Sequence, residues 1–343
     1  MLRVGIIGFG GMGQVHFDRY RRLVTEGYPI KLVSICDIDE AKLRGTDAVG
    51  DVGATVKPGQ HDLSSYSLYT DMDDMLKNEQ LDFVDIALPT YLHAEASIKA
   101  MEAGFHVLCE KPMALDSRQC QEMIAASQRT GRTLMIAHCL RFWPEYEYLK
   151  AAVDDGRYGR VTSAYLFRGG FTPRWSYQNW LLQKDKSGGC LLDQHIHDID
   201  TINWILGKPD KVSTVASNVI EGSGYDMVST NYIYSDGKVV NAQDDWTLNG
   251  DFGFQMEFRV NFERGNMVYR DGKLKVNPES GPGFEPELPK EDAYTREIKY
   301  FVSRLIAGEP IEIAPPTSSA DTIKIAEAEV ESAKRGGVPV RVE

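Results

Sequence analysis

A glycine pattern directly after an apolar run is the feature that most restricts how this 343-residue chain can fold. The run Arg3–Ile7 leads into the motif G-x-G-x-x-G. Its three glycines are Gly8, Gly10 and Gly13, and Gly11 and Met12 stand between the last two. This order predicts a buried strand, a tight turn and a helix, as in dinucleotide-binding α/β units. In such a unit Gly8 lets the chain turn, Gly10 leaves room for the pyrophosphate, and Gly13 lets the helix pack on its strand.

A second apolar run, Val33–Cys36, ends in an acid that predicts the choice of cofactor. Asp37 follows Gly13 by 24 positions, where a carboxylate accepts hydrogen bonds from the adenosine ribose hydroxyls. No cation follows Asp37 directly, since Lys42 and Arg44 come later. A carboxylate would repel a 2′-phosphate, so we expect NAD rather than NADP. The alternative is that Asp37 is an ordinary acid at the end of a strand.

Composition excludes several classes of partner. Lys and Arg number 38 against 50 Asp and Glu, giving a net charge of −12, which disfavours nucleic acid and anionic membranes. The 5 cysteines are widely spaced without C-x-x-C, as expected for reduced thiols in the cytoplasm. We expect no signal peptide, no membrane span, and neither a zinc nor a disulfide framework.

Secondary-structure patterns divide the chain into two parts. Residues 1–138 alternate strand and helix patterns, which predicts a doubly wound parallel sheet that binds the dinucleotide. Residues 139–343 are expected to form an α/β domain with a large open, mostly antiparallel sheet, serving substrate binding and oligomerisation. Strand patterns there cover 160–167, 211–220, 227–234, 238–248, 254–262 and 267–276. One face of this sheet is expected to pack on helices and the other to pair with a second subunit, making a homo-oligomer.

The segment Cys109–Pro112 places a lysine directly after a predicted strand of the first sheet. The carboxyl ends of parallel strands are where open α/β sheets bind ligands. The Lys111 ammonium can hold a substrate hydroxyl there and stabilise the oxyanion that develops as hydride leaves. The alternative is a surface lysine before a turn.

The segment Ser187–Asp200 contains an acid and a histidine at helical spacing. Asp193 and His197 are i and i+4, so a continuous helix would place them on one face, where His197 could act as a base. One alternative is that Asp193 caps the helix and the histidine belongs to the core. Metal binding by Asp193, His195 and His197 is not expected, because His195 and His197 would project about 200° apart on a helix.

These motifs, with Ala87–His93 and Ala103–Met113, resemble the glucose–fructose oxidoreductase/inositol dehydrogenase (Gfo/Idh/MocA) family over essentially the whole chain. The resemblance implies a Rossmann domain, a second domain with a large open sheet, dimers or tetramers, and NAD(P)-dependent redox chemistry at a carbinol. It implies the catalytic residues Lys111, Asp193 and His197. The candidate cofactor-binding residues are Gly8, Gly10, Gly11, Met12, Gly13, Asp37, Pro89, His93, Glu110 and Lys111.

Departures from the family pattern concern the substrate pocket. His195 stands where many members have glycine, Thr90 where asparagine is common, and Leu181 follows Trp180 where arginine is common. The identity of the substrate is therefore not carried over. The candidate substrate residues are Arg141, Trp175, Trp180, Asp193, His195 and His197. The aromatic residues among them would otherwise belong to the core or to a subunit contact.

Together these features predict an NAD-dependent oxidoreductase acting on a carbinol of a sugar, sugar derivative or cyclitol. One alternative is an NAD-assisted glycosidase or lyase, in which transient oxidation of the sugar acidifies a neighbouring C–H. The other is a non-catalytic protein that senses a sugar or nucleotide.

Overall fold

The computed structural model describes residues 1–44 and 61–343, which form two compact units. The first unit comprises Met1–Cys139, Trp175–Trp180 and Tyr294–Ser319. The second comprises Leu140–Arg174, Leu181–Ala293 and Ala320–Glu343. Among the helices described, none is both long enough and apolar enough to cross a bilayer.

The first unit contains a 6-stranded, fully parallel sheet in the order β3-β2-β1-β4-β5-β6. This is the strand order of doubly wound dinucleotide-binding folds, in which the order reverses beside β1. The predicted parallel sheet is thus confirmed. Its strands are β1 (Leu2–Ile7), β2 (Ile30–Cys36), β3 (Ser67–Tyr69), β4 (Phe83–Ile86), β5 (His106–Glu110) and β6 (Leu134–Ala137).

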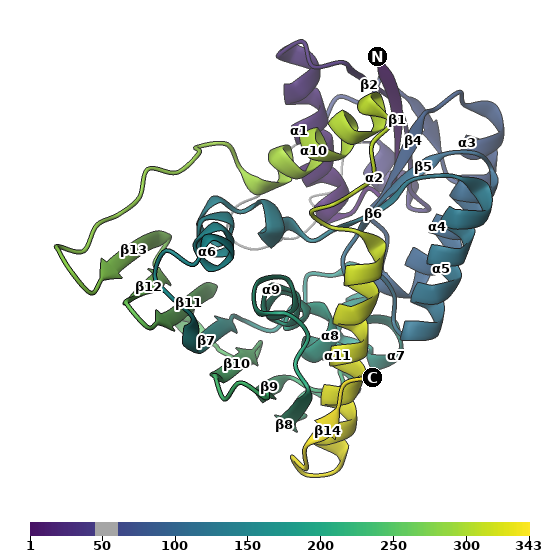
Figure 1. The fold of residues 1–343 in the computed structure, drawn as a ribbon. Coiled ribbons are helices and arrows are strands. Elements are labelled where there is room, and N and C mark those ends of the chain that lie inside the picture. Colours follow the sequence, from purple (N-terminus) through teal and green to yellow (C-terminus); the bar gives the residue numbers. More distant parts are fainter. Residues whose placement is uncertain (45–60) are drawn as a thin grey trace. The chain divides into compact units, whose positions relative to one another are not determined.

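Helices cover both faces of this sheet, with α1 and α10 on one side and α4 and α5 on the other (Figure 1). Asp116 caps α5 by accepting from the Gln119 amide over 2.8 Å, and Gly131 ends that helix in a left-handed conformation. In α10, Phe301 packs edge-on against Phe83 of β4 at 5.3 Å. The helices are α1 (Gly11–Thr25), α2 (Glu40–Leu43), α3 (Met72–Asn78), α4 (His93–Glu102), α5 (Ser117–Thr130) and α10 (Ala293–Ala307).

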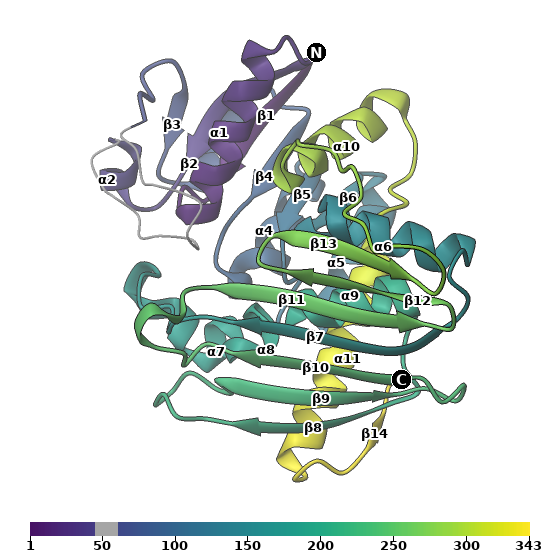
Figure 2. The same cartoon turned by 90° about the vertical axis from the view of Figure 1, so that its left-hand side faces the viewer.

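The second unit contains an 8-stranded sheet in the order β13-β12-β11-β7-β10-β9-β8-β14 (Figure 2). Only β7 and β10 pair in parallel among its described strands, so the expectation of a mostly antiparallel sheet is confirmed. The strands are β7 (Val161–Gly169), β8 (Lys211–Ser217), β9 (Met227–Ile233), β10 (Val239–Asp245), β11 (Gln255–Phe262), β12 (Gly265–Arg270), β13 (Lys273–Pro278) and β14 (Val340–Arg341).

One predicted strand divides in two. The sequence predicts a strand over residues 267–276 and also a short turn at Arg270–Gly272, and the chain reverses at this turn, between β12 and β13. Asp271 and Gly272 both adopt positive φ there, of 52° and 72°, as a tight hairpin turn requires. The turn signal in the sequence therefore overrides the apolar pattern around it.

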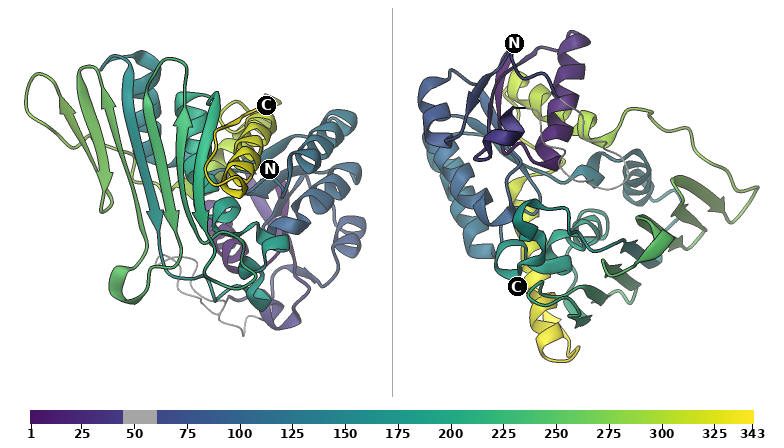
Figure 3. Two further views of the ribbon diagram at one scale, coloured as in Figure 1. Left: turned by 90° about the horizontal axis from the view of Figure 1, so that it is seen from below. Right: turned by 180° about the vertical axis from the view of Figure 1, so that it is seen from behind.

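Helices of the second unit gather on one face of its sheet (Figure 3). The opposite face shows no helix among the described residues (Figure 2). Val215, Ile233 and Val239 are exposed and each follows or precedes a buried residue of its strand, so they belong to this uncovered face. Val239 and Ile233 lie opposite each other on β10 and β9. The remaining helices are α6 (Pro144–Asp155), α7 (Lys184–Ser187), α8 (Gly189–Asp193), α9 (Ile196–Leu206) and α11 (Pro316–Lys334).

Candidate functional site

The glycine turn between β1 and α1 leaves one open position. A Cβ on Gly8, where φ is +95°, would lie 2.5 Å from the Ala87 carbonyl oxygen, and one on Gly13 would lie 1.9 Å from the Gly8 oxygen. These two glycines are therefore required by the backbone itself. A Cβ on Gly10, at the N-terminus of α1, would instead meet no heavy atom of residues 1–44 and 61–343 within 4 Å. Backbone N–H groups at such a terminus attract a phosphate, so the turn fits a dinucleotide pyrophosphate.

Asp37 fixes the end of β2 to this turn. Its Oδ2 accepts a hydrogen bond from the Phe9 amide at 2.7 Å, and its Oδ1 accepts one from the Asp39 amide at 2.8 Å. The Lys42 ammonium lies 3.0 and 3.1 Å from the two carboxylate oxygens and 4.7 Å from the centre of the Tyr177 ring. Both side chains of this ion pair are buried. A cation that the sequence places only later in the chain thus contacts the predicted ribose-binding acid.

Lys111 follows the last residue of β5 and is half-buried. Its backbone N–H donates to Glu110 Oε2 at 3.0 Å. The other Glu110 oxygen lies 3.2 Å from Nε2 of His16 on α1, and His16 Nδ1 lies 2.9 Å from Asp85. The buried Glu110 side chain is therefore placed to position Lys111.

His16 and Glu110, which form a buried row with Asp85, favour each other's charged forms. Burial lowers the pKa of His16, but Asp85 and Glu110 outweigh it and raise that pKa well above its usual value. Burial raises the pKa of Glu110, but His16 and Lys111 outweigh it and bring that pKa below its usual value. The His16 ring therefore lies as an imidazolium between the side chains of Asp85 on β4 and Glu110 at the end of β5.

His93 is the first residue of α4 and follows the half-buried Pro89 by four positions. Its Nδ1 lies 2.8 Å from the Pro112 carbonyl oxygen, and its Nε2 lies 2.7 Å from the Leu88 carbonyl oxygen. Burial lowers the pKa of His93, with the two carbonyl contacts opposing it. Both ring nitrogens thus contact backbone carbonyls, and the expected cofactor contact of His93 stays a prediction.

The segment expected as one helix is two. α8 ends at Asp193 and α9 begins at Ile196. The His195 amide donates to the Cys190 carbonyl at 2.9 Å, a span of five residues instead of the four of an α-helix. The extra residue turns His195 into the interior, while Asp193 and His197 on either side are half-buried.

Two predicted substrate contacts lie in the interior of the second unit. The Arg141 guanidinium makes a two-pronged ion pair with Asp200, at 2.9 and 2.7 Å, and is almost fully buried. The His195 side chain is 0% exposed, with Nε2 3.3 Å from both Glu329 and the Tyr232 hydroxyl. Both side chains contact buried partners of the second unit, and their expected substrate contacts stay predictions.

The two candidate tryptophans are placed differently. Trp175 and Trp180 are half-buried and belong to the short segment that joins the first unit, beside Tyr177. In this segment Gln178 and Asn179 adopt left-handed φ of 51° and 53°. This is a sharp local bend that a pattern of aromatic residues does not signal.

Sequence reasoning missed three relationships between side chains. These are the ion pair of Lys42 with Asp37, the row that links His16 to Glu110, and the buried partners of His195. Only the first carried a signal, a lysine five positions after the acid. The others join residues from separate elements.

A glycine turn with an open position before a helix, on a doubly wound sheet, defines a dinucleotide-binding α/β protein. A family model for the oxidoreductase family with an NAD-binding Rossmann fold matches residues 2–138, and one for the GFO/IDH/MocA C-terminal domain matches residues 146–268. The chain therefore belongs to the Gfo/Idh/MocA family of oxidoreductases, and its N-terminal part is an NAD-binding domain.

Curated relatives differ in how much of the chain they match. A 2,7-anhydro-N-acetylneuraminate hydratase of Mediterraneibacter gnavus is 34% identical over 175 residues, 49% of this chain and 46% of that protein. The match thus spans about half of that relative's length. Inositol 2-dehydrogenase 2 of Saccharopolyspora erythraea is 25% identical over 329 residues, 90% of this chain and 86% of that protein.

A solved structure supports the fold over the full length. Levoglucosan dehydrogenase, in complex with NADH and levoglucosan, aligns with a TM-score of 0.84 and 23% identity, covering 99% of each chain. At this identity the similarity concerns the fold.

Proposed function

We propose that the chain is an NAD-dependent oxidoreductase that moves a hydride between nicotinamide and a carbinol of a sugar, sugar derivative or cyclitol. The observation that carries this proposal is the open space at Gly10 before the N-terminus of α1. Membership of an oxidoreductase family supports the redox class. Bound nicotinamide supplies the hydride acceptor in the oxidation direction.

Lys111 is the proposed electrostatic group. Its ammonium holds the substrate hydroxyl and stabilises the alkoxide as the proton leaves. Support comes from its position directly after β5 and from the hydrogen bond that ties its amide to Glu110 at 3.0 Å. Glu110 and His16 are thereby positioning residues for Lys111.

His197 is the proposed general base. In the oxidation direction it accepts the hydroxyl proton while the carbon loses hydride, so the carbinol becomes a carbonyl and His197 an imidazolium. Asp193 is proposed to orient His197 and bind substrate. Both side chains are half-buried, which suits groups that meet substrate, and they flank the buried anchor His195.

NAD is the proposed cofactor in preference to NADP. Asp37 keeps a carboxylate at the end of β2, and the next residue, Ile38, is an exposed apolar side chain without charge. A 2′-phosphate would gain no cation from Ile38 and would face the Asp37 carboxylate.

We also propose a division of labour along the chain. Residues 1–138 bind the dinucleotide, and 139–343 bind substrate, with Trp175 and Trp180 offering aromatic faces to a sugar ring. The helix-free face of the second sheet is the proposed interface of a cytoplasmic homodimer or homotetramer. The exposed Val215, Ile233 and Val239 support this role.

A second candidate is redox-assisted elimination or hydration. A hydroxyl is first oxidised to a ketone, the acidified neighbouring C–H then loses its proton as a leaving group departs, and the ketone is finally reduced again. No net NADH forms. The match to a 2,7-anhydro-N-acetylneuraminate hydratase favours this variant, since adding water to a substrate needs no net redox change.

One screen separates the candidates. Purified protein is incubated with NAD and panels of cyclitols, aldoses, uronates, glycosides and anhydro-sugars, and both NADH and carbohydrate products are followed. Accumulating NADH with an oxidised product supports the dehydrogenase. A new product without NADH supports the redox-assisted reaction. Tight NAD and sugar binding without any product contradicts both and indicates a sensing protein.

A further inference from the structure

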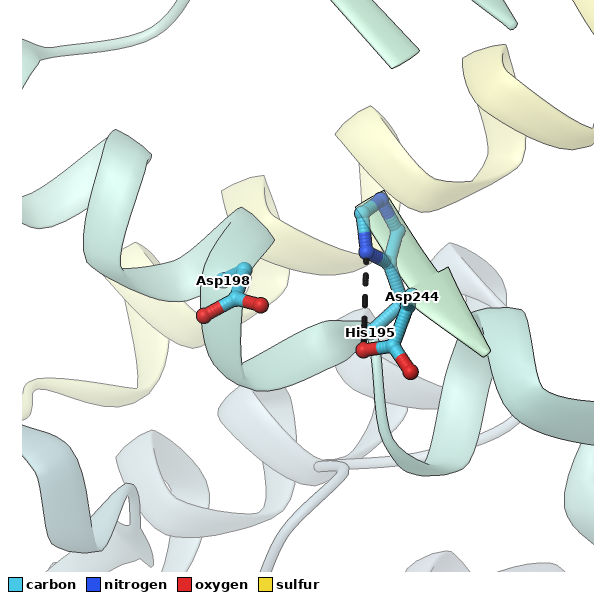
Figure 4. Close-up of side chains that lie close together, drawn as sticks. All are labelled: His195, Asp198 and Asp244. Carbon is cyan, nitrogen blue, oxygen red and sulfur yellow. Dashed lines mark ion pairs between the residues drawn. The ribbon is translucent and has the colours of Figure 1, made fainter. Parts of the chain in front are cut away.

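A closed cluster of polar side chains lies in the interior of the second unit. His195 at the start of α9, Asp198 in its first turn, and Asp244 on β10 each present one side-chain atom, and these atoms lie within 4.8 Å of one another (Figure 4). All three residues are at most 1% exposed. The sequence offers only the spacing of His195 and Asp198, since Asp244 comes from a distant strand.

Each of the three residues has one polar atom with a partner and one without a hydrogen-bond partner among the described residues. Asp198 Oδ1 lies 3.0 Å from the Arg168 guanidinium, while Asp198 Oδ2 has no partner in the part of the chain that the structure describes. Asp244 Oδ1 accepts from Gln194 Nε2 at 2.6 Å, while no described residue donates to its Oδ2. Leaving a buried polar atom without a partner costs free energy of folding, so the pattern indicates that a ligand binds these atoms.

His195 shows the same division. Its Nε2 lies 3.3 Å from Glu329, while its Nδ1 has no hydrogen-bond partner within residues 1–44 and 61–343 and lies 3.8 Å from Asp244 Oδ2. Metal-binding histidines commonly use their second nitrogen on a carboxylate, and ligating carboxylates are themselves hydrogen-bonded. The three free atoms and their supporting contacts match that arrangement.

Charge in this interior is also unbalanced. Asp198, Asp244 and Glu329 are three buried acids, whereas Arg168 is the buried permanent cation beside them. These acids outnumber Arg168 by two, and an excess of buried negative charge is expensive in a low-dielectric interior. One divalent cation at the cluster would balance it.

We propose that His195, Asp198 and Asp244 bind one divalent transition-metal cation, which fixes the turn between α8 and α9 to β10. The ligand set of one imidazole and two carboxylates suits Zn²⁺, and Zn²⁺ outcompetes Mn²⁺ at such nitrogen–oxygen sites. Ligands about 2.1 Å from a tetrahedral ion lie about 3.4 Å apart. The 3.8 Å between His195 and Asp244 needs only a small contraction to reach that spacing.

The test begins with the unmodified full-length protein. It is produced in zinc-supplemented medium, purified without chelator, and analysed for metals by mass spectrometry. We expect one zinc per chain, resistant to dialysis because the site is buried, and released to a chromogenic chelator when the protein is unfolded in guanidinium. X-ray absorption at the zinc edge should show nitrogen and oxygen ligands and no sulfur, although Cys190 lies 3.2 Å from Asp244 Oδ1.

Variants locate the ion. Asp198→Asn and His195→Gln should abolish retention of zinc, and Glu329→Gln should weaken binding about 10–100-fold, as loss of a supporting contact does. Asp251→Asn, on an exposed residue outside the cluster, should keep one equivalent. Where a variant does not fold, the absorption spectrum of the unmodified protein still decides the ligands.

Three results overturn the proposal. Unmodified protein that carries no metal after growth with zinc or manganese shows that protons balance the buried acids. An absorption spectrum with sulfur ligands shows that the zinc binds at a site other than this cluster. Zinc retained equally by folded Asp198→Asn and His195→Gln also lies elsewhere.

Discussion

The Lys42 ammonium contacts both carboxylate oxygens of Asp37, at 3.0 and 3.1 Å, inside the buried end of β2. A lysine is therefore paired with the acid that we propose selects NAD over NADP. Removing the acid would free that cation for a 2′-phosphate.

We expect the unmodified protein to prefer NAD by kcat/KM and Asp37→Ser with Ile38→Arg to shift the preference toward NADP. Losing one charged contact and gaining another is worth about 1.5–3 kcal/mol each, so the change in the NADP/NAD ratio should be at least about tenfold. Steady-state kinetics with both cofactors measure it. Lys42→Met added to the double variant should reduce the gain. A preference of the unmodified protein for NADP contradicts our interpretation of Asp37.

Lys111→Ala is expected to lower the rate of hydride transfer about 100- to 1000-fold, because it removes a cation aimed at the developing alkoxide. NAD binding, titrated separately by fluorescence, should persist, since the glycine turn is unchanged. Lys99→Ala, an exposed lysine of α4 paired with Asp73, is the matched control and should leave both values near normal. Near-normal hydride transfer in Lys111→Ala would remove it from the mechanism.

His197→Ala is expected to lower the oxidation rate about 100- to 10,000-fold and to remove the acid limb of its pH profile. Asp193→Asn should lower the rate but keep the acid limb, because the proposed base His197 is still present. Stopped-flow profiles across pH distinguish these two effects. A limb that stays in His197→Ala belongs to another group.

Glu297 on α10 provides a test of stability against pH. It is fully buried, and neither carboxyl oxygen has a hydrogen-bond partner among the residues that the structure describes. Burial raises the pKa of Glu297 well above its usual value, and Glu110 adds to the rise. A raised folded pKa means that stability is fully present below the unfolded value and is lost as pH rises through the folded one. Glu297→Gln should therefore stabilise the protein by about 1–3 kcal/mol at alkaline pH.

Guanidinium unfolding from acid to alkaline pH measures this difference, with exposed Glu95→Gln on α4 as the control. The two proteins should converge at low pH, where Glu297 is neutral in both the folded and unfolded states. Equal stability of the unmodified protein and Glu297→Gln at alkaline pH would show that the carboxyl group has an unseen partner.

The open sheet face leads to a prediction about assembly. Light scattering at micromolar concentration should show a homodimer or homotetramer, and Ile233→Glu should shift it toward monomer, since it places a charge among exposed apolar side chains. Val338→Glu, an exposed residue outside the sheet, should leave the assembly unchanged. A monomer in the unmodified protein contradicts the interface.

Features encoded by neighbouring residues could be predicted from the sequence. The strand–turn–helix around Gly8, and helix α5 between its cap Asp116 and Gly131, depend on local spacing alone. β3 could not be found, since three residues carry no periodicity. The division of β12 from β13 depended on weighing a two-residue turn against a longer apolar pattern.

The site divides along the same line. Lys111 could be placed because a lysine after a parallel strand needs only the strand. Arg141 and His195 could not be placed, because their partners Asp200 and Glu329 come from α9 and α11. Polar residues near a catalytic motif read as ligand contacts until the long-range partner that occupies them is known.

The five-residue span that turns His195 inward has a practical consequence for redesign. Residue 195 stands between Asp193 and His197 yet faces away from anything that diffuses to them. Replacing it with the glycine common in related proteins would alter the spacing of both neighbours at once. A shift in substrate preference in such a variant would therefore report a moved backbone, and selectivity is better sought at the half-buried Trp175 and Trp180.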